Sequence, residues 1–228
     1  MIIDAVRNNA EWCQVMCAAH GHPGTFGARA WTSTRRTPLY YPDAVTLTED
    51  ADVKDVLDGI DRTTPGASVK DSFARLDLAA EGFRLLFEAS WIHRPAGLPA
   101  AAPAGEWRAV RTPDELAAWA LAWSDGDEDE AALFRPELLV DPATTVVAGY
   151  GPDGRVLGGA VLSGSDTVTG VSNLFTAGDT DPVQVWSGCL GLIASDRPVV
   201  GYESGDDLTA ALAAGFQEAG PLRVWLDA

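Results

Sequence analysis

Two short stretches place polar side chains beside apolar runs, where they could do acid–base chemistry. Glu203 directly follows the apolar run 198–202, which is typical of a buried strand, and precedes a Ser-Gly-Asp-Asp break. Ser172 and Asn173 interrupt the otherwise apolar run 168–175. A carboxylate at the end of a buried strand could take a proton from an amine or hold a cationic group. The alternative is structural: Glu203 would cap the helix that follows, and Asn173 would satisfy backbone groups.

A second set of candidates combines guanidinium donors with aromatic faces in the first half of the chain. Arg35, Arg36, Tyr40 and Tyr41 could bind a carboxylate or phosphate on a small ligand, and a surface loop is the structural alternative. His93 could act as a general base, or lie as a solvent-facing residue at a strand end.

Metal sites have weaker support in the sequence. Cys13, Cys17, His20 and His22 nominally supply four ligands along one helix and its end. Their spacing is not that of a structural zinc site, and a buried small-residue face is the alternative. The acidic run 124–130 could attract Ca²⁺ but lacks the spacing of an EF-hand loop. We therefore expect no metal.

Composition excludes several functional classes. The chain has 228 residues and a formal net charge of −17, and residues 107–228 carry most of that charge. Such an acidic surface repels a phosphate backbone, so we expect no nucleic-acid partner. No apolar run is long enough for a membrane helix, and no secretory signal is expected. Three cysteines fit reduced thiols, so we expect a cytoplasmic protein. We also expect a monomer or homodimer with a small-molecule substrate. There is no G-x-S-x-G, H-E-x-x-H, Walker A or G-x-G-x-x-G motif.

Periodicity and turn residues predict an α/β chain in two parts. The segment 94–106 is rich in Pro, Ala and Gly and reads as a connection across a surface. We predict a first part at 1–94, a linker at 95–106 and a second part at 107–228. Expected elements include a helix from Asn8 or Asn9 to Ala19, an edge strand at 37–41, helices at 49–60, 113–123 and 183–194, and a hairpin of strands 144–150 and 155–162.

The segment 197–228 has the order strand, short helix, Gly-Phe, strand, and the segment 76–94 repeats its later part. With the order of elements from Trp107 onward, this resembles the GNAT superfamily of N-acetyltransferases. The resemblance implies two GNAT-like units, each a mixed and mostly antiparallel sheet flanked by helices, with the N-terminal unit incomplete.

The sequence departs from the family where the acyl donor should bind. The family has a Gly-rich, basic loop before a helix, whose amides hold the pyrophosphate of acetyl-CoA. Here residues 176–186 contain one Gly, no basic residue, and Asp179 and Asp181, and Pro182 removes an amide donor. Ala211 replaces the general-acid Tyr that is frequent in the family. We therefore expect that this loop does not hold acetyl-CoA or another acyl-CoA in the standard way.

The resemblance places the substrate where the strands ending near Asn173 and Glu203 separate. It implies an N-acyltransferase acting on a small amine or amino-acid-like substrate, with Glu203 as the catalytic residue. The predicted substrate-binding residues are Ser172, Asn173, Tyr202, Arg35, Arg36 and Tyr41. The alternatives are a non-catalytic GNAT fold that binds a small ligand or protein partner, and acid–base chemistry without coenzyme A.

Overall fold

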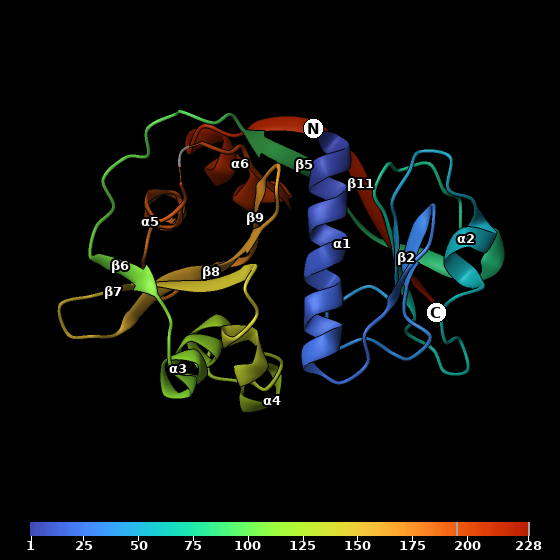
Figure 1. The fold of residues 1–228 in the computed structure, drawn as a ribbon, viewed down its shortest axis with the longest axis horizontal. Helices are drawn as coiled ribbons and strands as arrows, with labels where there is room; N and C mark the ends of the chain where they lie inside the picture. The colour runs from blue at the N-terminus through green and yellow to red at the C-terminus, as the bar shows by residue number, and fades with distance from the viewer. Residues whose placement is uncertain (195, 228) are drawn as a thin grey trace. The chain divides into compact units, whose positions relative to one another are not determined.

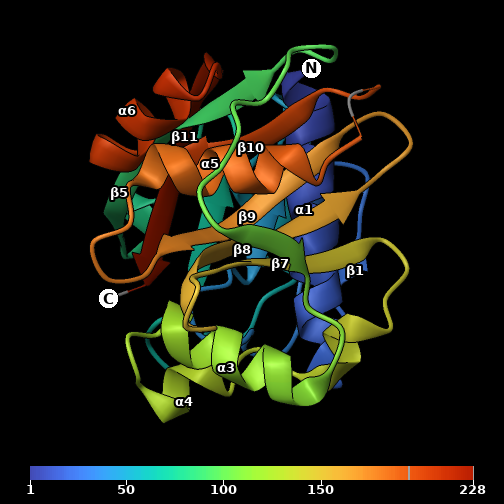
Figure 2. The ribbon, with the colours of Figure 1, turned by 90° about the vertical axis from the view of Figure 1, so that its left-hand side faces the viewer.

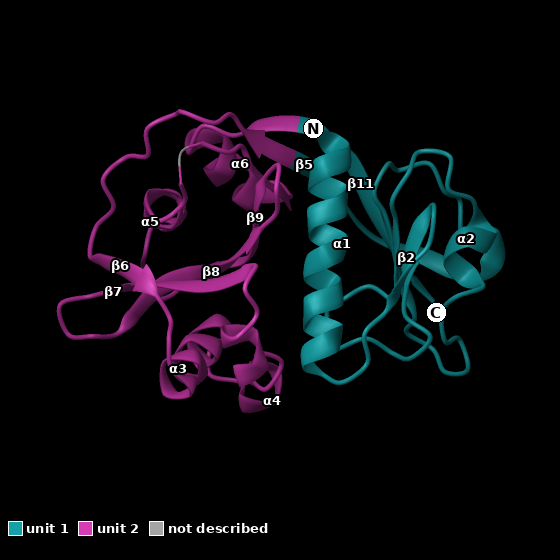
Figure 3. Cartoon of the chain, viewed as in Figure 1, with its two compact units in different colours: residues 1–91, 219–228 teal, residues 92–218 magenta. Residues whose placement is uncertain are grey.

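The computed structural model describes residues 1–194 and 196–227, which form two compact units (Figures 1 and 3). Unit 1 comprises residues 1–91 and 219–228, and unit 2 comprises residues 92–218. The long strands β5 (Phe83–Arg94) and β11 (Gln217–Asp227) contribute residues to both units. These two units are defined by contacts within the chain. The predicted division into 1–94, 95–106 and 107–228 was based on a repeated sequence pattern and a linker, and it remains a prediction.

Unit 1 is a sheet with a helix on each face. Its strand order is β1-β2-β3-β4-β11-β5. The pairs β1–β2, β2–β3 and β4–β11 are antiparallel, and β3–β4 is parallel, with Ala44 opposite Val69. Alternate residues of β4 point to opposite faces: Val69 packs with α2, and the Lys70 ammonium donates to Asn9 of α1. The bounds of the remaining elements are α1 Ile2–Ala19, β1 Thr25–Phe26, β2 Ala30–Thr32, β3 Ala44–Thr46, α2 Val53–Leu57, β4 Ser68–Asp71 and the 3₁₀ turn η1 Ala79–Glu81.

Unit 2 has the strand order β5-β10-β9-β8-β7-β6, with helices on both faces (Figure 1). A Cβ at Gly158 would meet Val185 of α5, and one at the next residue, Gly159, would meet Trp119 of α3. Figure 2 looks onto the face that α5 covers. The bounds are β6 Glu106–Ala109, α3 Pro113–Trp123, α4 Glu128–Ala131, η2 Pro136–Leu139, β7 Thr144–Tyr150, β8 Val156–Gly164, β9 Thr169–Thr176, α5 Pro182–Gly191, β10 Val199–Glu203 and α6 Gly205–Ala213.

The mixed α/β sheet with flanking helices confirms the predicted fold class, but several predicted elements are wrong. Helix α1 begins at Ile2, because Asn8 and Asn9 are buried inside it and do not cap it. The predicted strand 37–41 is a turn in which the Tyr41 amide donates to the Pro38 carbonyl. Helix α2 is shorter than 49–60, because Asp52 and Asp55 form a capping box that starts it at Val53. Helix α5 ends at Gly191, not at residue 194. No helix in the described part of the chain is long and apolar enough to cross a membrane.

Candidate functional site

Strand β9 contains a bulge at two of the predicted substrate-binding residues, Ser172 and Asn173. On β8, Gly159 and Val161 are two positions apart, but their partners on β9, Phe175 and Ser172, are three apart. The extra residue is accommodated near Asn173, whose φ of 52° lies in the left-handed region. A bulge bends a strand and re-aims its side chains, so β9 changes direction at Ser172 and Asn173.

Strand β10 runs parallel to β9 but pairs with it only at its beginning. Among the described residues, Val199 pairs with Thr169 and Val200 with Gly170, and the paired register ends there. Gly201 is still close to β9, since a Cβ there would lie 3.0 Å from the Val171 carbonyl oxygen. The same offset, continued, sets Tyr202 level with Ser172 and Glu203 level with Asn173. The bulge therefore coincides with the place where the two strands stop pairing, and four predicted site residues flank that place.

The Glu203 carboxyl is half-buried and has an unusual proton affinity. Burial raises its pKa to about 8, and the negative charge of Asp207 on α6 adds to the rise. Among the residues that the structure describes, none forms a hydrogen bond with the Glu203 carboxylate. The predicted structural alternative, a cap on α6, is wrong, because Ser204 is the N-cap and no side chain caps this helix. A carboxyl group with a pKa near neutrality can act as a general base.

The loop between β9 and α5 does not fit a pyrophosphate. The Asp181 carboxylate accepts the Val183 amide at 2.9 Å, and the Gln184 amide donates to the Asp181 carbonyl. Pro182 has no amide hydrogen. The first donors of the helix are therefore used within the chain, and the Asp181 carboxylate lies at the N-terminus of the helix, where it would repel an anion. Sequence reasoning did not identify Arg155, a cation from the β7–β8 turn that lies close to this loop. A Cβ added at Gly178 would be 3.9 Å from Arg155 Nη1.

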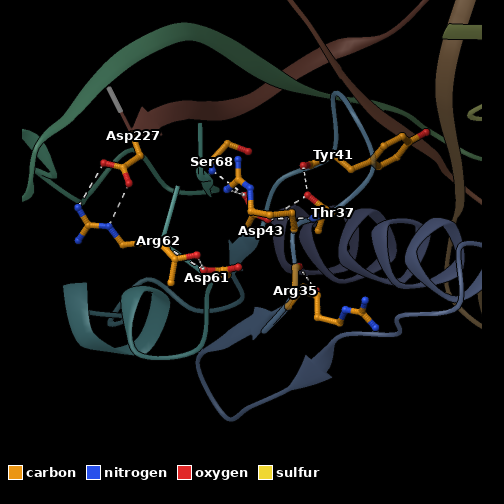
Figure 4. Close-up of polar contacts among 11 residues, drawn as sticks. Arg35, Thr37, Tyr41, Asp43, Asp61, Arg62, Ser68 and Asp227 are labelled. Carbon is orange, nitrogen blue, oxygen red and sulfur yellow. Dashed lines mark hydrogen bonds and ion pairs between the residues drawn. The ribbon is translucent and has the colours of Figure 1, made fainter. Parts of the chain in front are cut away.

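The predicted basic and aromatic residues of unit 1 lie in the loop between β2 and β3 (Figure 4). Arg36 donates to the buried Asp43 at 3.0 Å, and Tyr41 is buried with its ring 6.1 Å from that of Trp12. Arg35 is exposed and points away from Asp43 in Figure 4. Arg36 and Tyr41 thus hold the loop, whereas Arg35 is the most accessible of the three. Their role in substrate binding stays a prediction.

The environments of the candidate cysteines and of His93 favour structural roles. Cys13 and Cys17 are buried, and burial raises the pKa of the Cys17 thiol to about 12. Among the described residues, no group of three or more His, Cys, Asp or Glu side chains is placed to hold a metal ion. His93 is half-buried, and burial lowers its pKa, which disfavours the charged imidazolium.

Two pockets of unit 2 lie apart from Glu203. One, of about 480 Å³, is lined by residues that include Leu162, Thr169 and Arg197, at the start of β9. The other, of about 310 Å³, lies between α3, α4 and η2. Glu203 lines neither of them, so the candidate site rests on the separation of β9 and β10 and on the carboxyl group itself.

Comparison with known proteins identifies the fold. The sequence matches no protein-family model and no curated protein. Among solved structures, it is similar to a GCN5-related N-acetyltransferase from Kribbella flavida, with a TM-score of 0.62 and 15% identity over 98% of this chain and 95% of that one. It is also similar to a functionally unknown conserved protein from Staphylococcus epidermidis ATCC 12228, with a TM-score of 0.65 and 11% identity over 89% and 92% of the two chains.

These similarities show that the chain has the GNAT fold, as its C-terminal pattern predicts. Because the sequence identities are low, these similarities establish the fold but do not identify the substrate. The predicted repeat, with a truncated first unit, remains a prediction.

Proposed function

We propose that this GNAT-fold chain is an N-acyltransferase acting on a small amine or amino-acid-like substrate, with Glu203 as its general base. The observation that carries the proposal is the Glu203 carboxyl. It is half-buried at the end of β10, level with the bulge of β9, and its pKa is raised to about 8. The fold shared with an N-acetyltransferase supports the reaction class.

The proposed chemistry begins with proton transfer. An amine is protonated at neutral pH and cannot attack until it loses a proton. The ionised Glu203 carboxylate takes that proton, and the free lone pair attacks the carbonyl carbon of the acyl donor. A C–N bond forms and the bond to the leaving group breaks. The leaving group takes the proton back from Glu203, and the new amide nitrogen releases its second proton to water. Because the pKa of Glu203 is raised, its carboxylate is a stronger base than an ordinary Glu.

The neighbouring polar residues would orient the substrate. The Ser172 hydroxyl, the Asn173 amide and the Tyr202 phenol can each donate and accept hydrogen bonds. By register these residues lie near one end of the β9–β10 pair, and we propose that the bulge turns side chains of β9 toward the substrate. Such groups suit a substrate with a polar group close to its amine, as in an amino acid.

The acyl donor is a separate question. Asp181 caps α5 where the fold family binds the pyrophosphate of acetyl-CoA, and its negative charge disfavours that group there. We propose that the donor is recognised through its acyl end and not through its nucleotide. Acetyl-pantetheine, which lacks the nucleotide, should then serve about as well as acetyl-CoA.

The test is an acetylation assay with a panel of primary amines and amino acids, with acetyl-CoA and acetyl-pantetheine as donors. The kcat/KM of the wild type should rise with pH and level off above about 8. Glu203→Gln should lose about 10²- to 10⁴-fold in kcat. The matched control is Asp206→Asn, an exposed acid on the first turn of α6, which should keep its activity and its pH profile.

Two outcomes would contradict the proposal. If Glu203→Gln keeps full activity, Glu203 is not the base. If no amine in the panel is acetylated, yet an amine raises the melting temperature of the wild type but not of Glu203→Gln, the alternative of a non-catalytic ligand-binding fold takes its place.

A further inference from the structure

Strand β5 has an exposed apolar stretch in its first half. Phe83 is buried, and from Ala89 onward the strand is buried or half-buried, but all five residues from Arg84 to Glu88 are exposed. Three of them are large and apolar: Leu85, Leu86 and Phe87 are 42%, 44% and 39% exposed. Successive side chains of a strand point to opposite faces. The exposure therefore covers both faces of β5, which buried sheet strands do not show.

One backbone edge of this stretch is also open. In unit 1, β5 is the last strand of the order and pairs on one side with β11. Its other neighbour, β10, has only five residues, and its central residue, Gly201, lies beside Ile92, since a Cβ there would be 3.7 Å from Ile92 Cγ1. Strand β10 extends two residues beyond Gly201 in either direction. Among the described strands, it therefore cannot reach back to Arg84–Glu88.

The sequence of this open stretch is complementary to itself. It reads Arg84-Leu85-Leu86-Phe87-Glu88. In an antiparallel pair of two such strands centred on Leu86, each Arg84 lies opposite a Glu88, and each Leu85 lies opposite a Phe87. A shift by one residue in either strand loses both Arg–Glu pairs. Opposite charges and apolar pairs directly across an antiparallel ladder are the contacts that stabilise a sheet.

We propose that residues 84–88 of β5 form a docking edge for a second copy of this chain, which makes a two-fold symmetric dimer by antiparallel strand pairing. A two-fold interface places the same patch on both subunits, so residue 84 meets residue 88 and residue 88 meets residue 84. Each copy has one such edge, so the pairing closes at two chains.

The charged residue at the end of the edge is already held in place. Arg223 of β11 donates from Nε to Glu88 Oε1 at 2.8 Å, which leaves Oε2 for a guanidinium from the second copy. An open apolar edge is an aggregation hazard unless it is covered, and a closed dimer covers it. The contact is small, below roughly 1,200 Å² in total, so the dimer should be reversible and dependent on concentration.

The experiment is sedimentation velocity on the full chain over a concentration series, with hydrogen exchange measured at both ends of the series. We expect the sedimentation coefficient to rise from monomer to dimer, and amide protection to rise within residues 84–88. Arg84→Glu would place Glu opposite Glu88 twice and should weaken dimerisation by about tenfold or more. Leu86→Lys would place two ammonium groups at the two-fold axis and should do the same.

The matched control is Arg75→Glu, which makes the same change of charge at an exposed arginine of unit 1 that pairs with Glu49. It should dimerise like the wild type. All the substituted side chains are exposed, and circular dichroism would confirm that each variant is folded. The proposal is overturned if the wild type stays monomeric at every concentration. It is also overturned if a dimer forms that neither Arg84→Glu nor Leu86→Lys weakens, because the dimer would then use another surface.

Discussion

The charged side chains buried in unit 1 differ from Glu203 of unit 2 in what surrounds them. Asp43 accepts four hydrogen bonds, from the Thr37 and Ser68 amides, the Thr37 hydroxyl and the Arg36 guanidinium. The Lys70 ammonium donates to Asn9 at 2.8 Å. Glu203 is half-buried and, within the described part of the chain, receives no hydrogen bond.

This contrast separates polar groups that stabilise the fold from a polar group that is available to a ligand. Burying a charge is costly unless it is paired and hydrogen-bonded, and unit 1 offsets part of that cost with contacts inside the unit. Burial still raises the pKa of Asp43, while its hydrogen bonds and Arg36 act in the opposite direction. The Glu203 carboxyl meets the cost of burial by holding its proton up to about pH 8. A cationic substrate beside Glu203 would stabilise its ionised carboxylate. Carboxyl groups with pKa values shifted in this way are common at catalytic sites.

The largest expected effect is on the stability of unit 1. Asp43→Ala removes the acceptor of four hydrogen bonds and leaves Arg36 and two amides without their partner. We expect a loss of about 3–5 kcal/mol in the free energy of unfolding, measured by urea denaturation. Asp61→Ala, at a half-buried acid of the same unit that, among the described residues, accepts only from Thr63 two residues away, should change the urea midpoint little. A small effect of Asp43→Ala would show that the loop between β2 and β3 does not depend on this carboxylate.

A smaller effect, of opposite sign, is expected at Glu203. The folded-state pKa is raised from the ordinary 4.5 to about 8, so the native state holds this proton more tightly than the unfolded chain does. That stability is fully present below pH 4.5 and is lost as the pH rises through about 8. Gln is neutral at every pH and avoids the loss. Well above that pKa, Glu203→Gln should therefore be more stable than the wild type by about 2 kcal/mol, after allowance for partial exposure.

Urea denaturation across a pH series measures this difference. The two proteins should have nearly equal stability below pH 4.5, and the gap should open between that value and about 8. A gap that does not change with pH would mean that the Glu203 pKa is ordinary in the folded protein. Asp206→Asn controls for the loss of one negative charge. Asp206 lies in the first turn of α6 beside Asp207, but unlike Asp207 it is not a cause of the raised pKa of Glu203.

Much of the fold could be predicted from local patterns. The predictions of strand 144–150 and of the start of α3 were confirmed. A Pro-Asp-Gly turn and a Thr-Pro-Asp-Glu cap depend only on residues next to them in the sequence. The predicted start of α1 was wrong, because the Asn9 side-chain oxygen accepts a hydrogen bond from Lys70, 61 residues away, and does not cap the helix. Tertiary contacts override local signals of this kind.

The candidate site was predictable in part. An acid after an apolar run indicated Glu203, and two polar residues in an apolar run indicated Ser172 and Asn173. The bulge at Asn173 depends on how β8 and β9 pair, and the pKa of Glu203 depends on burial and on Asp207, so neither can be read from one strand. The open edge of β5 depends on the length of β10, which is a property of the sheet.

The smallest expected effect concerns the loop before α5, where either the charge of Asp181 or the shape of the loop could weaken binding of acetyl-CoA. If the Asp181 charge is what repels the nucleotide end of acetyl-CoA, Asp181→Asn should raise affinity for acetyl-CoA, because Asn still caps a helix but carries no charge. Removing one carboxylate near a phosphate at a surface is worth on the order of 1 kcal/mol, or about fivefold in Kd. Affinity for acetyl-pantetheine should not change, since it lacks the nucleotide. Isothermal titration calorimetry with both donors measures the difference, and equal changes for both would place the effect in the shape of the loop and not in its charge.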